Sequence, residues 1–228
     1  MINHKKLWQC WDGKSFYERS FENVLDQENN LDYDFFYKEN YNFTFYNSKC
    51  IYEPNECIIE KNDIIVDLGS NIGFFTDHAV QKCKKVISIE ASPELFSCLV
   101  KNTKNDHSNI EYLNAEIVAS PKQQSRERSL YSDTPSRIKI TIDDIFDLYN
   151  LEKIDFLKID IEGNEYALLD DFSERNKKRI KKIAIETHPS NKKDNEKLIK
   201  AMYGKKMYSF NWFIGSKSPQ TMFYFYDI

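Results

Sequence analysis

The chain has 228 residues, of which 41% are hydrophobic and 30% are charged, and its formal net charge is -4. This length fits one domain, or one domain with an extension, and the composition excludes disordered and fibrous proteins. The negative charge argues against a protein whose main task is to grip a nucleic acid.

The five cysteines are odd in number, widely spaced and free of any CxxC pair. The sequence therefore predicts neither a disulfide framework nor a zinc ribbon. It contains no run of about 18 apolar residues of the kind that a membrane helix requires. Residues 1–10 lack the apolar core of a secretory signal. We therefore expect a cytoplasmic protein.

Residues 1–56 form a polar stretch with scattered aromatic residues and one alternating, strand-like run at residues 41–45. We interpret this stretch as an aromatic-rich extension made of helices or loops that lead into a strand. Residues 57–228 are then the main domain, since the hydrophobic pattern changes shortly after residue 57.

From residue 63 onward, short apolar runs alternate with segments of helical periodicity, which is typical of an α/β fold around a parallel sheet. Strands are predicted at 64–66, 86–89, 110–113, 154–159 and 183–185. Helices are predicted at 74–82, 93–104, 142–151, 165–172 and 195–203. Residues 119–137 are predicted to form a loop.

The end of the chain follows a different pattern. Residues 208–212 alternate in polarity, residues 215–219 supply turn formers, and residues 222–226 form a second strand-like run. This pattern predicts an antiparallel hairpin that completes a mostly parallel sheet.

A glycine-containing bend lies between the strand at 64–66 and the helix that follows it. Gly69 permits a tight turn and the close approach of a ligand, and Asn71 tolerates a left-handed conformation. Gly73 permits the helix that follows the bend to pack close to the strand. Glu90 ends the next strand, where an acidic side chain can accept hydrogen bonds from both hydroxyls of a ribose. The pattern predicts a nucleoside-binding site.

The residue at the start of this bend favours one nucleoside. Dinucleotide-binding enzymes usually have the pattern G-x-G-x-x-G, but here its first glycine is replaced by Asp67, which would repel a pyrophosphate. An acidic group suits a ligand that carries an ammonium group and no phosphate. S-adenosylmethionine has both properties, so the pattern favours it over NAD.

A cluster of charged residues follows the strand at 154–159, and a histidine follows the next strand. If Lys158 is buried, it requires an acidic partner such as Asp160 or Glu162. The contact between them can be a purely structural ion pair or part of a ligand site. The general base could be Asp160 or His188. A histidine titrates near neutrality, which suits this role, although a structural or solvated histidine fits the sequence nearly as well. Ligands of open α/β sheets bind at this edge.

No ligand spacing in the sequence requires a metal ion, and we predict none. Asp160 and Glu162 near His188 are nevertheless groups that could hold Mg²⁺.

Residues 63–189 resemble the FkbM-type family of S-adenosylmethionine-dependent methyltransferases. The resemblance is carried by IIVDLGSNIGFFT, VISIEASPELF, the segment at 141–145 and IDFLKIDIEGNEYALL. It implies a class I methyltransferase, or Rossmann-like, fold with a mostly parallel seven-stranded sheet and a C-terminal antiparallel hairpin. Residues 57–228 would then be a methyltransferase domain that O-methylates a hydroxyl of a glycan or small natural product.

The resemblance also implies which residues form the site. The expected cofactor-binding residues are Asp67, Gly69, Ser70, Asn71, Gly73, Phe74, Glu90, Ala91, Ser92, Asn114, Ala115 and Asp160. The expected catalytic residues are Lys158, Asp160, Glu162 and His188.

Three alternatives stay open at this point. The first is an N-methyltransferase acting on an acceptor other than nucleic acid, because the residues at 160–163 differ from the proline-aromatic motif of nucleobase amino methylation. The second is a non-catalytic module that only binds S-adenosylmethionine, and the third is a dehydrogenase. We expect a small-molecule or glycan acceptor, no nucleic acid and no membrane span. The sequence does not define the acceptor, the oligomeric state or the role of the extension.

Overall fold

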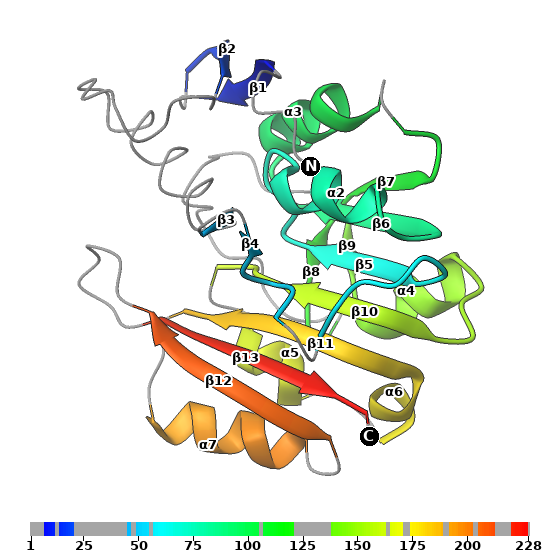
Figure 1. Cartoon of the computed structure of the whole chain (residues 1–228), viewed down its shortest axis with the longest axis vertical. Helices are drawn as coiled ribbons and strands as arrows, with labels where there is room; N and C mark the ends of the chain where they lie inside the picture. Colours follow the sequence, from blue (N-terminus) through cyan, green and yellow to red (C-terminus); the bar gives the residue numbers. More distant parts are fainter. Residues whose placement is uncertain are drawn as a thin grey trace.

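Seven strands form one mixed sheet through the middle of the molecule (Figure 1). The computed structural model describes residues 7–11, 14–20, 45–46, 49–54, 57–104, 107–120, 138–162, 165–170, 174–188, 192–202, 205–212 and 220–227. The strand order is β12-β13-β11-β10-β5-β6-β7. The strands are β5 (Ile64–Leu68), β6 (Lys85–Glu90), β7 (Ile110–Asn114), β10 (Ile154–Ile159), β11 (Ile180–Thr187), β12 (Lys206–Trp212) and β13 (Gln220–Tyr226).

The pairing confirms the predicted architecture. Strands β7, β6, β5, β10 and β11 pair in parallel, whereas β13 runs antiparallel to both β11 and β12. The C-terminal hairpin therefore lies at one edge of the sheet. This arrangement is an α/β fold of the class I methyltransferase type.

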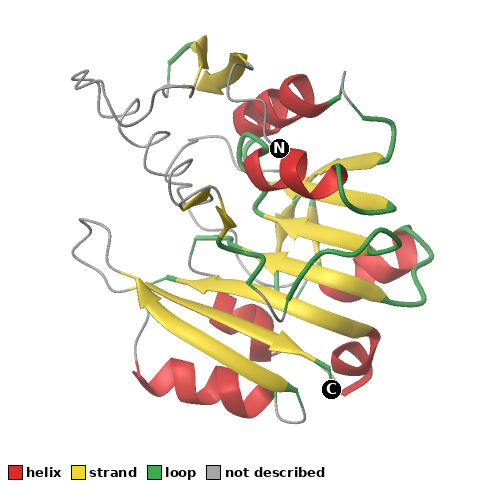
Figure 2. Ribbon diagram, in the orientation of Figure 1, coloured by secondary structure: helices red, strands yellow, loops and turns green. Residues whose placement is uncertain are grey.

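Helices cover both faces of the sheet (Figure 2). They are α2 (Phe74–Val80), α3 (Pro93–Thr103), α4 (Ile142–Leu148), α5 (Glu165–Asp170), α6 (Glu174–Arg179) and α7 (Lys192–Ala201). Helices α2 and α3 contribute to one hydrophobic core, and α4, α5 and α7 contribute to the other. The sheet separates the two cores because successive side chains of a strand point to opposite faces.

Two helix starts are capped by side chains. Ser92 caps α3 by accepting a hydrogen bond from the Leu95 amide, with Pro93 in the first helical turn. Thr141 and Asp144 form a reciprocal capping box at the start of α4.

The five predicted central strands and the five predicted helices all form, with ends that move by a few residues. Helix α6 is an addition to the prediction, as are the short parallel pair β8 (Glu116–Ile117) and β9 (Lys139–Ile140). Most of the predicted loop at 119–137 lies outside the described residues. So do residues 41–44 of the first strand-like run and the turn at 215–219.

The first described part of the chain is a hairpin that packs on α3, so the expectation of helices or loops at the start of the extension was wrong. Strands β1 (Leu7–Trp11) and β2 (Phe16–Ser20) pair antiparallel. Asn102 of α3 accepts from the Gln9 amide at 2.6 Å and donates to the Gln9 carbonyl at 3.0 Å. Trp8 is buried, and its ring centroid lies 4.7 Å from that of Phe74. The hairpin is therefore part of the core that covers α2 and α3.

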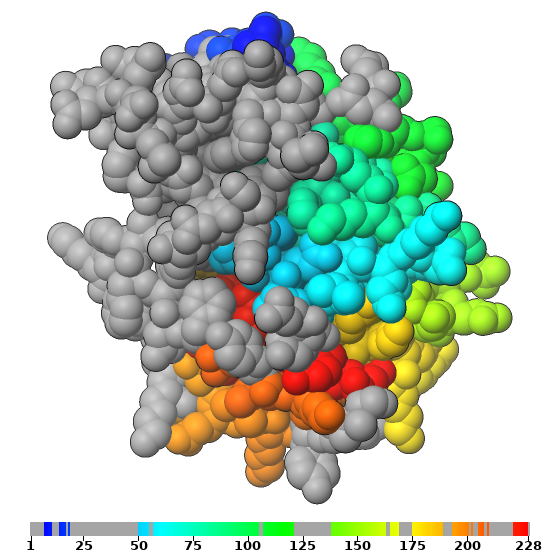
Figure 3. Space-filling view, in the orientation of Figure 1, coloured from blue at the N-terminus to red at the C-terminus, as the bar shows by residue number. Residues whose placement is uncertain are grey.

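A second short hairpin, β3 (Phe45–Tyr46) and β4 (Lys49–Cys50), leads into a segment fixed to α2. Glu53 contacts His78 at 2.8 Å and Lys82 at 2.6 Å. Burial alone would raise the pKa of Glu53, but the hydrogen bonds with these two residues lower it to about 2. In Figure 3 the cyan part of the chain, which includes residues 57–63, lies on the surface between α2 and the red strand β13.

The alternation of the strands brings polar side chains together at one edge. Three of these side chains lie near the carboxyl ends of β5, β10 and β11, namely Asp67, Lys158 and Glu186. Each stands two residues after a member of the hydrophobic core that contains α2, so its side chain points to the same face of the sheet as that core. Because these strands are parallel neighbours, their ends meet. No helix in the described part of the chain is long and apolar enough to cross a membrane.

Candidate functional site

The bend between β5 and α2 has the backbone conformations that its sequence predicts. Gly69, Asn71 and Gly73 have φ values of 74°, 52° and 101°. A Cβ atom on Gly69 would overlap the carbonyl oxygen of Asp160, so the neighbouring strand end makes the close approach there. A Cβ atom on Gly73 would lie 3.0 Å from side-chain atoms of Leu99 and Thr103. The helix that packs closely at this position is therefore α3, whereas the sequence suggested α2.

Glu90 is attached directly to the bend. Its Oε2 accepts from the Asn71 amide at 2.9 Å, and its Oε1 accepts from the Ser92 amide at 2.8 Å. Burial raises the pKa of Glu90 above its ordinary value, although both amide bonds oppose the shift. A carboxylate has about four acceptor positions, so two remain for hydroxyl donors of a ligand. The bend and the strand end thus form one polar rim.

Several expected cofactor-binding residues have side chains that make stabilising contacts within the protein. Ser70 Oγ donates to the carbonyl of Asp67 at 2.9 Å. The Asn114 side-chain amide donates to the carbonyls of Glu90 at 2.8 Å and Ala91 at 3.1 Å. Phe74 and Ala115 are buried, and Ser92 caps α3. These residues support the rim, and their assignment as cofactor contacts remains a prediction.

Lys158 is a buried cation beside the bend. Its Nζ lies 3.2 Å from Asp67 Oδ1 and 3.6 Å from Asp160 Oδ2. It also donates to the Gly69 carbonyl at 2.7 Å. Burial alone would lower the pKa of Lys158, but the charges of Asp67 and Asp160 outweigh that effect and raise it. Lys158 therefore holds the bend against the acidic strand end.

Asp67 has a second set of partners on the other side. Thr76 of α2 donates to Asp67 Oδ2 at 2.7 Å, and its hydroxyl lies 2.9 Å from that of Ser88 on β6. Asp67 is fully buried. The structure thus shows this carboxylate bound to Lys158 and Thr76, which links β5, β6, β10 and α2 below the bend.

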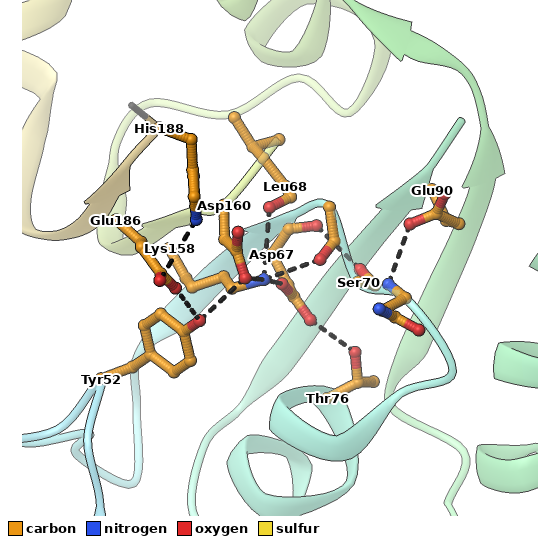
Figure 4. Close-up of polar contacts among 12 residues, drawn as sticks. Tyr52, Asp67, Leu68, Ser70, Thr76, Glu90, Lys158, Asp160, Glu186 and His188 are labelled. Carbon is orange, nitrogen blue, oxygen red and sulfur yellow. Dashed lines mark hydrogen bonds and ion pairs between the residues drawn. The ribbon is translucent and has the colours of Figure 1, made fainter. Parts of the chain in front are cut away.

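A chain of polar contacts extends from Asp160 across the strand ends (Figure 4). The Tyr52 hydroxyl lies 2.8 Å from Asp160 Oδ2 and 3.1 Å from Glu186 Oε2. His188 lies between two glutamates, with Nε2 3.2 Å from Glu186 and Nδ1 3.1 Å from Glu165. The five side chains therefore form one connected cluster, which we call the acidic cluster.

The charges of the acidic cluster determine the protonation state of His188. Burial alone would lower the pKa of His188, but hydrogen bonds with Glu165 and Glu186 raise it to about 12. At neutral pH the imidazole is therefore protonated on both nitrogens. Burial and the Asp160 charge raise the pKa of Glu186, while His188 opposes the shift.

Glu162 lies at the edge of the acidic cluster with a positive φ of 55°. Burial and the charge of Asp160 raise its pKa to about 7, although the charge of His188 opposes the shift. Because the folded-state value exceeds the unfolded value of 4.5, this group contributes stability that is full below pH 4.5 and lost as the pH rises through 7.

We therefore expect Glu162→Gln to reduce the dependence of stability on pH. The melting temperature of the wild type should fall more between pH 5 and pH 8 than that of the variant. The measurement is thermal unfolding by circular dichroism at both pH values, with the exposed Glu152→Gln as the matched control. Parallel changes in wild type and Glu162→Gln would contradict the raised pKa.

Three members of the acidic cluster also have the donor types of a metal site. Asp160, Glu186 and His188 each offer one ligand atom, and these atoms lie within 4.8 Å of one another. The same groups already contact each other and Tyr52, and a metal would have to displace the proton of His188. We assign no metal to them, and the sequence-based prediction that none is required remains a prediction.

The structure brings the expected catalytic residues Lys158, Asp160, Glu162 and His188 to one edge of the sheet. Sequence reasoning missed Tyr52, Glu165 and Glu186 as members of the site. Glu186 had a usable signal, because it lies near the end of β11, two residues before His188, which directly follows that strand. Tyr52 had none, since it is separated from Asp160 by 108 residues.

The family model described as methyltransferase FkbM domain matches residues 67–210, which is more than half of the chain. No curated protein matches the sequence.

Among solved structures, the chain is similar to a dimethyladenosine transferase from Plasmodium falciparum, with 15% identity, a TM-score of 0.50, and 74% of this chain and 57% of that chain covered. It is also similar to an rRNA methylase from Streptococcus thermophilus, with 11% identity, a TM-score of 0.48, and 75% and 90% covered. A third is TrmK of M. capricolum in complex with S-adenosyl-homocysteine, with 14% identity, a TM-score of 0.48, and 74% and 64% covered. At these identities the likeness concerns the fold alone.

Proposed function

Because this chain belongs to the FkbM methyltransferase family and is thus a methyltransferase, we propose that it transfers the methyl group of S-adenosylmethionine to a hydroxyl oxygen. The acceptor in this proposal is a glycan or a small natural product. The observation that carries the proposal is the contact between the glycine bend and the acidic cluster. Gly69 lies directly against the Asp160 backbone, so a nucleoside at the bend would lie beside the carboxylate of Asp160.

The residues of the bend fit S-adenosylmethionine. Glu90 is fixed by two backbone amides and retains acceptor positions for ribose hydroxyls. The adjoining acidic cluster contains Asp160 and Glu186, and Glu162 lies at its edge. These acidic groups favour a cationic ligand over a pyrophosphate. When bound, S-adenosylmethionine supplies a methyl group on a positively charged sulfur. As the methyl group is transferred, the bond between its carbon and the sulfur breaks, and the sulfur keeps the bonding electron pair.

Asp160 is the group that we assign as general base. The sequence left His188 and Asp160 as candidates, but His188 already carries the proton that a base would take up. Asp160 is a partly exposed carboxylate at the strand end. It can accept the proton of an acceptor hydroxyl as the oxygen bonds to the methyl carbon. General base catalysis of this kind contributes roughly 10²- to 10⁴-fold.

Lys158 and His188 have supporting roles in this proposal. Lys158 holds Asp67 and Asp160 at fixed positions and fixes the Gly69 carbonyl, so it orients the rim. His188, as a cation, balances part of the negative charge of Glu165 and Glu186. Orientation of donor and acceptor at about 3 to 3.5 Å supplies much of the acceleration in such a transfer.

We propose an acceptor other than nucleic acid, and a cytoplasmic location. The net charge of -4 and the carboxylates beside Asp160 disfavour a polyanionic acceptor. All five cysteines are free thiols in the structure, which suits a reducing compartment. The division into an extension at 1–56 and a methyltransferase domain at 57–228 is part of the same proposal.

The test is a transfer assay with S-adenosylmethionine labelled in its methyl group. Purified glycans, hydroxylated small molecules, amines and RNA are supplied as separate acceptor pools, and Asp160→Asn serves as the variant with an impaired base. We expect label in a hydroxylated pool, with a rate in Asp160→Asn lower by about 100-fold. Label in the RNA pool or the amine pool would contradict the proposed acceptor class and identify that pool as the source of the acceptor. Tight cofactor binding with no label in any pool would indicate a binding module.

A further inference from the structure

Tyr52 contributes a hydroxyl to the site from outside the region that the family model matches. That region begins at residue 67, and Tyr52 lies in the segment that follows β4. The residue is 2% exposed. Figure 4 shows the ring beside Lys158 and the hydroxyl between Asp160 and Glu186. The acidic cluster is therefore completed by a residue that precedes the matched domain.

The segment that carries Tyr52 is fixed on both sides. On one side, the Tyr224 hydroxyl of β13 donates to the carbonyl of Ile51. On the other side, Glu53 holds His78 and Lys82 of α2. Contacts at these two neighbouring positions restrict the backbone of Tyr52, so its hydroxyl is placed by the fold.

The ring of Tyr52 is held as firmly as its backbone. Its centroid lies 5.5 Å from that of Phe75 in an edge-to-face arrangement. The Lys158 ammonium lies 5.2 Å from the same centroid. The ring therefore fills space next to the buried cation, and this packing does not depend on the hydroxyl.

The hydroxyl acts as a hydrogen-bond donor to the carboxylates. Burial and the charges of Asp160 and Glu186 raise the pKa of Tyr52 well above its ordinary value, so the phenol keeps its proton. One hydroxyl proton cannot be given fully to two carboxylates, and the shorter distance is to Asp160, at 2.8 Å against 3.1 Å. Asp160 therefore has the better hydrogen bond.

The two oxygens of Asp160 are used unequally. In the described part of the chain, both side-chain contacts of Asp160 involve Oδ2, from Tyr52 at 2.8 Å and from Lys158 at 3.6 Å. Oδ1 is then the oxygen that a bound group can use. If the Tyr52 hydroxyl were removed, Lys158 would be the remaining partner, and the carboxylate could turn toward that ammonium to form a closer ion pair.

We propose that Tyr52 is a positioning residue that holds Asp160 by its Oδ2, so that Oδ1 is presented to the acceptor beside the transferred methyl group. This inference rests on the proposed function, because it takes the methyl group to lie next to Asp160. It assigns a part of the extension to the catalytic geometry. Tyr52 does not itself touch the reacting atoms.

The experiment compares two ligands on one variant, Tyr52→Phe, which keeps the ring and removes the hydroxyl. The ligands are S-adenosylhomocysteine and sinefungin, an analogue with an amine at the position of the transferred methyl group. The amine reports on Asp160, whereas S-adenosylhomocysteine has no group there. Isothermal titration calorimetry gives the ratio of the two dissociation constants. We expect the preference for sinefungin to fall by about five- to tenfold in Tyr52→Phe, with the affinity for S-adenosylhomocysteine unchanged.

Tyr166→Phe is the matched control, since its hydroxyl bonds Asn195 on α7 at 2.6 Å and does not join the acidic cluster. It should keep the wild-type ratio, and melting temperatures show whether either variant is unfolded. An unchanged ratio in a folded Tyr52→Phe protein that binds S-adenosylhomocysteine would overturn the positioning role and leave the proposed function intact. A wild type that binds neither ligand would overturn both.

Discussion

Replacing Gly69 with alanine is expected to destabilise the protein by more than about 3 kcal/mol and to abolish cofactor binding. The residue has a φ of 74°, which costs a non-glycine residue free energy, and the new Cβ atom would overlap the carbonyl oxygen of Asp160. That oxygen belongs to the backbone of a strand end and cannot move aside as a side chain can. The bend must therefore shift, and the Gly69 carbonyl bound to Lys158 shifts with it.

Gly73→Ala provides the graded comparison for this substitution. Its φ of 101° also penalises a side chain, but the new Cβ atom would meet side-chain atoms of Leu99 and Thr103 at 3.0 Å. Urea unfolding gives the free energy for each variant, and calorimetry gives the affinity for S-adenosylhomocysteine. The difference between the two variants in the free energy of unfolding measures the cost of the overlap with the Asp160 carbonyl oxygen. A stable, ligand-binding Gly69→Ala protein would show that the bend is not packed as described.

Replacing Lys158 with methionine is expected to lower the free energy of unfolding by about 3 to 5 kcal/mol. The side chain is 4% exposed, and its ammonium is the cationic partner of the fully buried Asp67. Methionine keeps most of the volume and removes the charge, so a buried carboxylate loses its compensation. Chemical denaturation at neutral pH measures the loss.

Two further variants define the cause of this loss. Lys181→Met removes a cation from an exposed pair with Glu60, and a surface pair contributes about 1 kcal/mol or less. The double variant Lys158→Met with Asp67→Asn removes both charges of the buried pair and should recover part of the stability. A Lys158→Met protein as stable as Lys181→Met would contradict a structural role for the buried pair.

The parts of the site that depend on local pattern were predictable from the sequence. The bend is formed by residues within seven positions of one another, and each of its three left-handed residues is a glycine or an asparagine. Glu90 could be assigned because it ends the strand next in sequence, which is also the next strand in the sheet. Short-range chemistry of this kind is conveyed by residue type and spacing.

The main partner of Lys158 was harder to predict because it depends on strand register. The sequence suggested Asp160 or Glu162, which are close along the chain. The structure adds Asp67, because parallel pairing places Lys158 directly beside Asp67 on β5. The order β10-β5 in the sheet is a tertiary property that hydrophobic periodicity does not contain.

The state of His188 and the role of Tyr52 were beyond sequence reasoning. The histidine owes its raised pKa to glutamates on α5 and β11, and a histidine in isolation titrates near neutrality. Tyr52 reaches the site only because its segment is fixed to α2 and β13. Nothing in its polar surroundings distinguishes it from the other tyrosines of the chain.

The central claim is that the bend and Glu90 form a pocket for the nucleoside of S-adenosylmethionine. Calorimetric titration of the wild type and of Glu90→Ala, with S-adenosylhomocysteine and with NAD, tests it most directly. We predict binding of S-adenosylhomocysteine and not of NAD, weakened by about 100-fold or more in Glu90→Ala because two charge-assisted hydrogen bonds to the ribose are lost. Binding of NAD without S-adenosylhomocysteine, or equal affinity in wild type and a folded Glu90→Ala protein, would contradict the claim.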